Sequence, residues 1–275
     1  MNHFSVSSLK TFARCPREFH YRYDLGLESL EKGLDLEFGL FTHFYLQTRF
    51  AGFDFKDSIG AAQVNTPLSD YWLAIAKVVL EEYENLQDIG AHYQPEVVEG
   101  SFELTIGKYR YKGTIDLLAN RGGEYVLVDH KTTKSKDLSA FMDYRTFDPQ
   151  LQLYAYACEH FFKKPVRKMY YNVIRRPLLK QKNIEHFPQF LERIRDNIQS
   201  GGYFAEIPVE TNDLLQYQAI CDLNEYADMI EMGHRPRNAA SCRSFGRACD
   251  FVPVCSGEVE NPELASDLYQ VRVRK

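Results

Sequence analysis

The sequence predicts an α/β fold in which a mixed central sheet is flanked by helices. The middle of the chain alternates apolar and polar residues with a period of two, whereas the segments before and after it carry apolar residues at helical spacing. Between residues 125 and 174 a helical pattern separates two apolar strand patterns, which favours parallel pairing through a crossover. With 275 residues, 44% of them hydrophobic, the chain is long enough for one large domain.

Residues 1–92 are predicted to be mainly helical. Ser5 or Ser7 is a candidate cap for a first helix, which breaks at Cys15-Pro16 because proline cannot continue the helical hydrogen bonds. A second helix is expected from Leu36 to Phe50. Thr66-Pro67 is a favourable cap and first turn for a third helix.

Residues 93–183 carry the strand patterns and the crossover helix, and residues 184–275 add helices and a cysteine-rich end. Turn residues near Gly107 and Gly122 separate three β-rich runs, which predicts an antiparallel meander. We expect all of 1–275 to form a single domain. The expected strands are Val97–Leu104, Tyr109–Leu118, Tyr125–Lys131 and Lys168–Ile174, and the expected later helices are Asp148–Phe162, Ile184–Ser200 and Asn212–Met232.

Charge and hydropathy limit the classes of function. The net charge of −5 weighs against a broadly basic nucleic-acid binder, although lysines and arginines cluster locally. No apolar run reaches the roughly 20 residues of a membrane span, and no signal-peptide pattern is present, so we expect a cytoplasmic protein without membrane contact. The chain also lacks a phosphate-binding loop motif, so it is not expected to be a motor itself.

Two carboxylates and a lysine converge in the predicted meander. Asp129 and Lys131 point to the same face of one strand, and a hairpin partner can place Asp116 beside them. Carboxylates held close together repel each other unless a hard cation such as Mg²⁺ or Mn²⁺ lies between them. The backbone carbonyl of His130 is a further candidate ligand, since its side chain points to the opposite face. The alternative is a surface ladder of ion pairs.

The order of these motifs resembles the PD-(D/E)XK nuclease superfamily, specifically its RecB-like exonuclease branch. The resemblance rests on four segments: Gly39 to His43, Gly113 to Asp116, Val128 to Lys131, and Gln150 to Tyr154. It implies a restriction-endonuclease-like core and an enzyme that hydrolyses DNA with Mg²⁺ or Mn²⁺.

The resemblance also implies a role for each matching residue. His43, Asp116 and Asp129 are expected to hold the metal, with Lys131 as the catalytic lysine. Gln150 and Tyr154, one helical turn apart, are expected to complete the site and touch the DNA backbone. Glu99 is a candidate supporting residue, with Glu96 and Glu103 as nearby competitors.

Four cysteines form a second candidate site. Cys242, Cys249 and Cys255 lie in a loop-like segment, and Cys15 is the obvious fourth thiolate for zinc or an iron–sulfur cluster. One cysteine before the core and three after it are similar to the AddB-type and CRISPR-associated RecB-like exonucleases, which implies a structural [4Fe-4S] cluster. Zinc, or four unrelated buried thiols, are the alternatives. The remaining two, Cys158 and Cys221, are expected to be core residues.

These observations predict a stand-alone DNA exonuclease for recombination, repair or replication, with a phage or mobile-element origin as one option. Arg243, Arg247 and Phe245 are candidate DNA-binding residues, because basic and aromatic side chains bind single strands without sequence preference. A helicase or recombination protein is a candidate partner, and the oligomeric state is open. One alternative is a non-catalytic iron–sulfur subunit that binds DNA ends. The other is a zinc-stabilised adaptor without nucleic-acid chemistry.

Overall fold

The computed structural model describes residues 3–31, 33–87, 92–138, 147–244, 247–260 and 265–272. The chain divides into two compact units, each built from separate stretches of sequence. The first unit contains residues 1–32, 103–113 and 217–275, and the second contains 33–102 and 114–216. The prediction of a single domain over 1–275 therefore stays a prediction, and the units do not follow its boundaries at 92 and 183.

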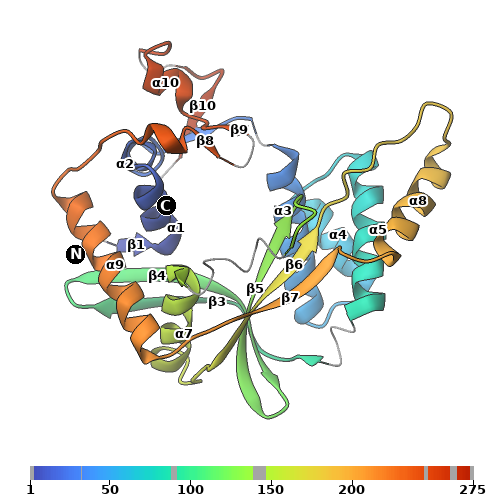
Figure 1. Cartoon of the computed structure of the whole chain (residues 1–275), viewed down its shortest axis with the longest axis horizontal. Helices are drawn as coiled ribbons and strands as arrows, with labels where there is room; N and C mark the ends of the chain where they lie inside the picture. The colour runs from blue at the N-terminus through green and yellow to red at the C-terminus, as the bar shows by residue number, and fades with distance from the viewer. Residues whose placement is uncertain are drawn as a thin grey trace. The chain divides into compact units, whose positions relative to one another are not determined.

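Strands of one sheet carry Glu99, Asp116, Asp129 and Lys131, and Figure 1 labels these strands. Strand β4 pairs with β3 on one side and runs antiparallel to β5 on the other. Strand β6 runs parallel to β5 and antiparallel to β7, so the sheet is mixed, as predicted. The strands are β3 (Gln94–Ile106), β4 (Tyr109–Arg121), β5 (Glu124–Thr133), β6 (Lys168–Arg175) and β7 (Phe204–Val209).

Helices flank this sheet and supply most of its apolar core. Aromatic and aliphatic side chains of α3, α5 and α8 form one buried cluster, which includes Phe38, Val79 and Phe190. Helix α7 forms the crossover between the parallel strands β5 and β6. The helices of the second unit are α3 (Leu34–Phe50), α4 (Phe55–Asn65), α5 (Asp70–Gln87), α7 (Pro149–His160) and α8 (Phe187–Gln199).

The first unit is built around the two ends of the chain. Strand β1 pairs in parallel with the start of β4, and β10 pairs antiparallel with β2. Tyr21, Leu27, Phe251 and Tyr269 form a small core beside that second pair. The elements are β1 (His3–Ser5), α1 (Val6–Arg14), α2 (Pro16–Phe19), a π-helical turn (His20–Asp24), β2 (Leu27–Ser29), β8 (Arg243–Ser244), β9 (Arg247–Ala248), α10 (Val252–Ser256) and β10 (Tyr269–Val271). Helix α9 (Asp213–Glu231) begins with the last residues of the second unit, and its remaining residues, from Tyr217 on, belong to this unit.

Several expected elements are confirmed. The Ser5 side chain accepts a hydrogen bond from the Ser8 amide and caps α1, and the helix stops before Pro16. The three strands of the meander and the crossover lie where the pattern placed them, although each strand is longer. Within the described parts of the chain, no helix is long and apolar enough to cross a membrane.

One expectation was wrong and one strand was not predicted, and each difference has a local cause. Thr66 ends helix α4 instead of starting the next one, and α5 begins only at Asp70. Thr66-Pro67 is a helix-start signal in isolation, but helix α4 precedes it directly and Thr66 is the C-cap of that helix. Strand β7 was also missed, because it is short and contains Pro208, which argues against a strand in the middle of a sheet.

Candidate active site and cysteine site

Three side chains from three elements of the second unit converge at one point. His43 of α3, Glu99 of β3 and Asp116 of β4 each offer a ligand atom, and these atoms lie within 4.8 Å of one another. His43 Nδ1 lies 3.6 Å from Asp116 Oδ2. The three residues line the same cavity, of about 490 Å³, together with Lys131. One imidazole and two carboxylates form a donor set suited to a divalent cation.

The charge of Asp116 is poorly tolerated without a cation. Burial and the negative charge of the neighbouring Asp129 together raise the pKa of Asp116 to about 8. Burial also lowers the pKa of His43, with the positive charge of Lys131 acting in the same direction. Both shifts favour the uncharged forms, so a bound cation is the partner that would allow Asp116 to ionise.

Asp129 lies beside this group and is almost fully buried. Its Oδ1 accepts a hydrogen bond of 3.1 Å from Gln150 Nε2, and its other oxygen contacts the Lys131 ammonium group. Burial lowers the pKa of Lys131, but the carboxylates of Asp129 and Asp116 outweigh burial and raise it overall. The structure therefore brings Asp129, Lys131 and Gln150 together, with Lys131 in its charged form.

The start of helix α7 positions Gln150. Asp148 precedes Pro149 and caps the helix by accepting a hydrogen bond of 2.9 Å from the Gln150 amide. Its second oxygen accepts a hydrogen bond of 2.9 Å from Tyr171 of β6. Sequence reasoning did not single out Asp148, although an aspartate before a proline at a helix start is a recognisable capping signal.

Tyr154 lies one turn further along α7 and is buried. Its ring packs edge-on against Phe102, with the ring centres 5.5 Å apart. Burial and the negative charges of Asp129 and Asp116 raise the pKa of the Tyr154 hydroxyl. The tyrosine therefore remains protonated close to the acidic residues, and a contact to DNA stays a prediction.

The backbone and the side chain of His130 contact different residues. Its backbone amide donates a hydrogen bond of 2.7 Å to Asp116 Oδ2. Its ring stacks on Phe50 with the centres 5.5 Å apart, and Nδ1 lies 2.9 Å from Asn172 Nδ2. The side chain thus leaves the cavity, as alternation along a strand predicts. A role for the His130 carbonyl as a metal ligand stays a prediction.

Glu99 is held in an unusual backbone conformation. Its φ angle is +49°, a region that non-glycine residues rarely occupy and that costs energy. Such strain is concentrated at functional sites, where the surrounding structure keeps it in place. The two alternative glutamates form ion pairs instead: Glu96 pairs with Lys164, and Glu103 pairs with Arg110. Among the three glutamates, the geometry therefore selects Glu99.

The four cysteines of the second candidate site line one cavity in the first unit. Cys15 lies between α1 and α2, and Cys255 lies on α10. Cys249 donates its backbone amide to the Cys242 carbonyl over 2.8 Å. Burial raises the pKa of the Cys249 thiol, and the nearby carboxylates of Glu18 and Asp250 act in the same direction.

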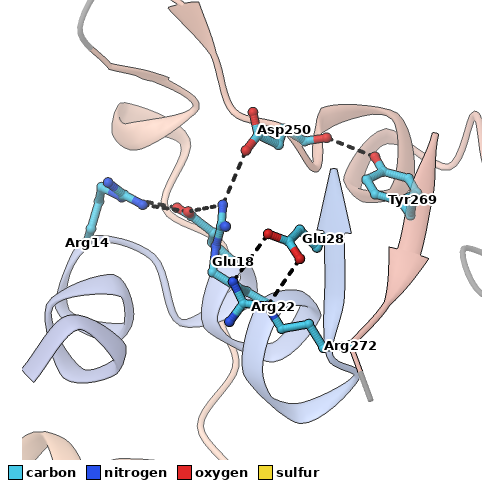
Figure 2. Close-up of polar contacts among 7 residues, drawn as sticks. All are labelled: Arg14, Glu18, Arg22, Glu28, Asp250, Tyr269 and Arg272. Carbon is cyan, nitrogen blue, oxygen red and sulfur yellow. Dashed lines mark hydrogen bonds and ion pairs between the residues drawn. The ribbon is translucent and has the colours of Figure 1, made fainter. Parts of the chain in front are cut away.

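An arginine joins the two segments that carry these cysteines (Figure 2). Arg22 Nη2 lies 3.5 Å from Glu18 Oε1 and 3.2 Å from Asp250 Oδ2, and its guanidinium covers the Phe251 ring. Tyr269 donates its hydroxyl to the Asp250 carbonyl over 2.8 Å. Charged and aromatic contacts therefore hold the segment after Cys15 against the segment around Cys249.

The remaining predicted residues are two cysteines and three candidate DNA-binding residues. Cys158 is fully buried on α7, as expected for a core residue, whereas Cys221 on α9 is only half-buried. Arg243 is exposed on β8. Phe245 and the side chain of Arg247 lie outside the described residues, so their predicted contact with DNA stays a prediction.

Comparison with known proteins identifies the family and the fold. Residues 3–256 match the model of the PD-(D/E)XK nuclease superfamily. No curated protein has a sequence that matches the chain. The structure is similar to that of a candidate exonuclease from Eubacterium rectale, with 12% identity, 93% of both chains covered and a TM-score of 0.53. That likeness confirms the α/β fold with a mixed central sheet flanked by helices.

An alkaline exonuclease from Laribacter hongkongensis is also similar. It shares 10% identity over 84% of this chain and 89% of that one, with a TM-score of 0.34. A phage-related exonuclease from Haemophilus somnus has the same identity and TM-score, with 84% of this chain and 96% of that one covered.

Proposed function

Because this chain belongs to the PD-(D/E)XK nuclease superfamily, we propose that it is a divalent-metal-dependent DNA exonuclease that acts in recombination, repair or replication. The observation that carries the proposal is the group formed by His43, Glu99 and Asp116 beside the Asp129–Lys131 pair. A surface ladder of ion pairs would not bury Asp129 or place a histidine and two carboxylates around one point.

The donor set fits Mg²⁺ or Mn²⁺, and His43, Glu99 and Asp116 would hold the ion, with Asp129 as the neighbouring carboxylate. When bound, the ion supplies positive charge to the phosphate and makes water more acidic. Lys131 carries a second positive charge on the same cavity, which stabilises the negative charge that develops during phosphodiester hydrolysis. Gln150 fixes Asp129, and the His130 amide fixes Asp116, so both carboxylates are oriented before substrate arrives.

We also propose that Cys15, Cys242, Cys249 and Cys255 hold an iron–sulfur cluster, as in the RecB-like branch. Sulfur atoms around one zinc ion lie about 3.8 Å apart, given bonds of about 2.3 Å in a tetrahedron. Over the described residues, the His43 group is the one set of three such ligand atoms that lie mutually within 4.8 Å, so no three of the four sulfurs approach one another that closely. The wider spacing supports a cluster over zinc. Its role would be structural, because it would join segments more than 220 residues apart.

The experiment that tests the nuclease is digestion of end-labelled single- and double-stranded DNA by protein purified without oxygen. It compares magnesium, manganese and chelator, with Lys131→Ala as the inactive variant and Lys168→Ala as the matched control. Lys168 forms an exposed ion pair with Glu124 on the same sheet, away from the cavity. We expect metal-dependent digestion that Lys131→Ala lowers by about a thousandfold and Lys168→Ala leaves intact.

The order of label release gives the polarity of digestion. Tight DNA binding without digestion under any condition would contradict the proposal and favour the non-catalytic subunit that binds DNA ends. Iron and acid-labile sulfide assays test the cluster separately. Zinc in place of iron, with neither digestion nor DNA binding, would favour the adaptor.

A further inference from the structure

Two positively charged residues follow directly on the parallel strands β5 and β6. Lys134 comes after Thr133, the last residue of β5, and Arg176 comes after Arg175, the last residue of β6. Thr133 and Arg175 are paired across the sheet, and the Arg176 amide donates to the Thr133 carbonyl over 2.7 Å. The carboxyl ends of parallel strands are the usual place for ligands in open α/β sheets.

Both cations hold one carboxylate, that of Asp35 in the first turn of α3. Arg176 donates from Nε and Nη2 to Asp35 Oδ1 over 3.0 and 2.7 Å, and Lys134 Nζ lies 3.0 Å from Asp35 Oδ2. The Arg176 guanidinium also lies 5.2 Å from the centre of the Trp72 ring. An arginine fork and a lysine converging on two oxygens is the arrangement that binds a phosphate.

Asp35 belongs to the cavity that contains the candidate metal ligands. Both Asp35 and His43 line it from α3, eight residues apart, which corresponds to about 12 Å along a helix. Leu36 and Leu40 line the cavity between them and remain 49% and 43% exposed. Large apolar side chains left exposed one helical turn apart provide an apolar surface on which an unstacked base can pack.

We infer that Arg176 and Lys134 bind a backbone phosphate of the substrate strand near the scissile one, and that Asp35 occupies this phosphate position until DNA displaces it. The neighbouring base packs on Leu36 and Leu40. This subsite rests on the proposed function, since it orients a strand toward His43, Glu99 and Asp116. Two cations and one carboxylate leave a net charge of about +1. A phosphodiester carries the same single negative charge as the Asp35 carboxylate, so it can replace the carboxylate between the two cations.

The competing explanation is an ion pair that only fastens the start of α3 to the sheet. The two explanations predict different changes in the affinity for DNA when Asp35 is replaced by asparagine. If Asp35 occupies a phosphate position, Asp35→Asn releases the cations and tightens DNA binding. If the ion pair is structural, the same substitution lowers the melting temperature and leaves affinity for DNA unchanged or weaker.

The test measures binding of a short fluorescent single-stranded oligonucleotide by anisotropy, in chelator, so that no cleavage is needed. We expect Arg176→Ala and Lys134→Ala to raise Kd by about five- to tenfold, and Arg176→Ala to reduce the salt slope by about one. We expect Asp35→Asn to lower Kd by about threefold. Arg193→Ala and Glu185→Gln are the matched controls, because Arg193 forms a similar two-point ion pair with Glu185 outside the cavity.

A second measurement tests whether a base of the substrate packs on Leu36 and Leu40. Leu40→Ser should weaken binding of the normal oligonucleotide and leave binding of an abasic one unchanged. Kd values for the Asp35 and Arg176 variants that move no more than those of the controls would overturn the subsite, even if the protein digests DNA. Binding through Arg176 without any digestion would instead overturn the proposed function and leave the subsite standing. No DNA binding at all would overturn both.

Discussion

The backbone amide of His130 donates a hydrogen bond of 2.7 Å to Asp116 Oδ2, across the antiparallel pair β4 and β5. The strand that carries Asp129 and Lys131 therefore also fixes the carboxylate of the neighbouring strand. His130 contributes this through its backbone, while its ring is used to anchor the strand against Phe50 and Asn172. The Asp116 carboxylate is thus oriented before a cation arrives, which favours metal binding.

Asp116→Asn should stabilise the metal-free protein at alkaline pH while abolishing digestion of DNA. The pKa of Asp116 is about 8 in the folded protein and about 3.9 in an unfolded chain. The folded state therefore holds an extra proton, so its stability falls by up to about 1.4 kcal/mol per pH unit between these values. Asparagine does not titrate and escapes that loss.

The measurement is urea unfolding in chelator at pH 5 and pH 8. The stability difference between the variant and the original protein should grow with pH and then disappear or reverse in excess Mn²⁺, which binds the ionised carboxylate. A difference that does not change with pH would contradict the predicted titration. Asp228→Asn is a suitable control, since this residue pairs with Lys108 away from the cavity.

Glu99→Asn should lower the affinity for Mn²⁺ without lowering the melting temperature. Asparagine tolerates a positive φ better than glutamate does, so it relieves backbone strain while removing the charged ligand. We expect at least a tenfold weaker Mn²⁺ affinity in titration calorimetry. Glu96→Gln, which loses only an ion pair with Lys164, should leave that affinity unchanged. Equal affinity for Glu99→Asn and the original protein would exclude Glu99 as a ligand.

The sequence could identify the residues of β5 because the strand is regular. Alternation along Val128 to Lys131 correctly placed Asp129 and Lys131 on one face and the His130 ring on the other. The spacing of Gln150 and Tyr154 likewise followed from an ordinary helix. In each case a single period governs the whole segment, so position along the chain determines direction.

The sequence could not choose between Glu96, Glu99 and Glu103, because β3 is not regular. The positive φ at Glu99 interrupts the alternation, and a period-two argument fails beyond that point. The cluster of Asp35, Arg176 and Lys134 could not be predicted from the sequence either, because it depends on a tertiary contact between Asp35 and Arg176, which are 141 positions apart. A local sequence pattern does not show which strand ends lie side by side in the sheet.

Cys15→Ser should destabilise the first unit and leave the metal group of the second unit intact. Removing one thiolate leaves three ligands for a group that requires four, and the free energy of cluster binding is then lost from folding. We expect a lower melting temperature and loss of bound iron, with unchanged Mn²⁺ affinity in titration calorimetry. Cys221→Ser, a half-buried cysteine outside the cysteine cavity, is the control. Loss of Mn²⁺ binding in Cys15→Ser would show that the two sites depend on each other.

Gly39→Ala should reduce digestion of DNA although alanine favours a helix by about 1 kcal/mol over glycine. A Cβ atom at residue 39 would lie 2.9 Å from Thr132 Oγ1, which is closer than two such atoms approach. Helix α3 must then move away from β5, or Thr132 must rotate. Movement of the helix would displace His43, one turn along it, relative to Asp116, and rotation of Thr132 would alter the cavity wall.

A second substitution separates this crowding from any other effect of Gly39→Ala. Thr132→Ala removes the Oγ1 atom that the new methyl group meets, so the double variant should recover most of the lost activity and Mn²⁺ affinity. Thr132→Ala alone should have little effect on either quantity, because none of the candidate ligands, all of which are described, hydrogen-bonds to that hydroxyl. If the double variant is as inactive as Gly39→Ala alone, close packing of α3 on β5 is not the reason for glycine at this position. If it recovers, the short approach at Gly39 is what sets the distance between His43 and the carboxylates of the sheet.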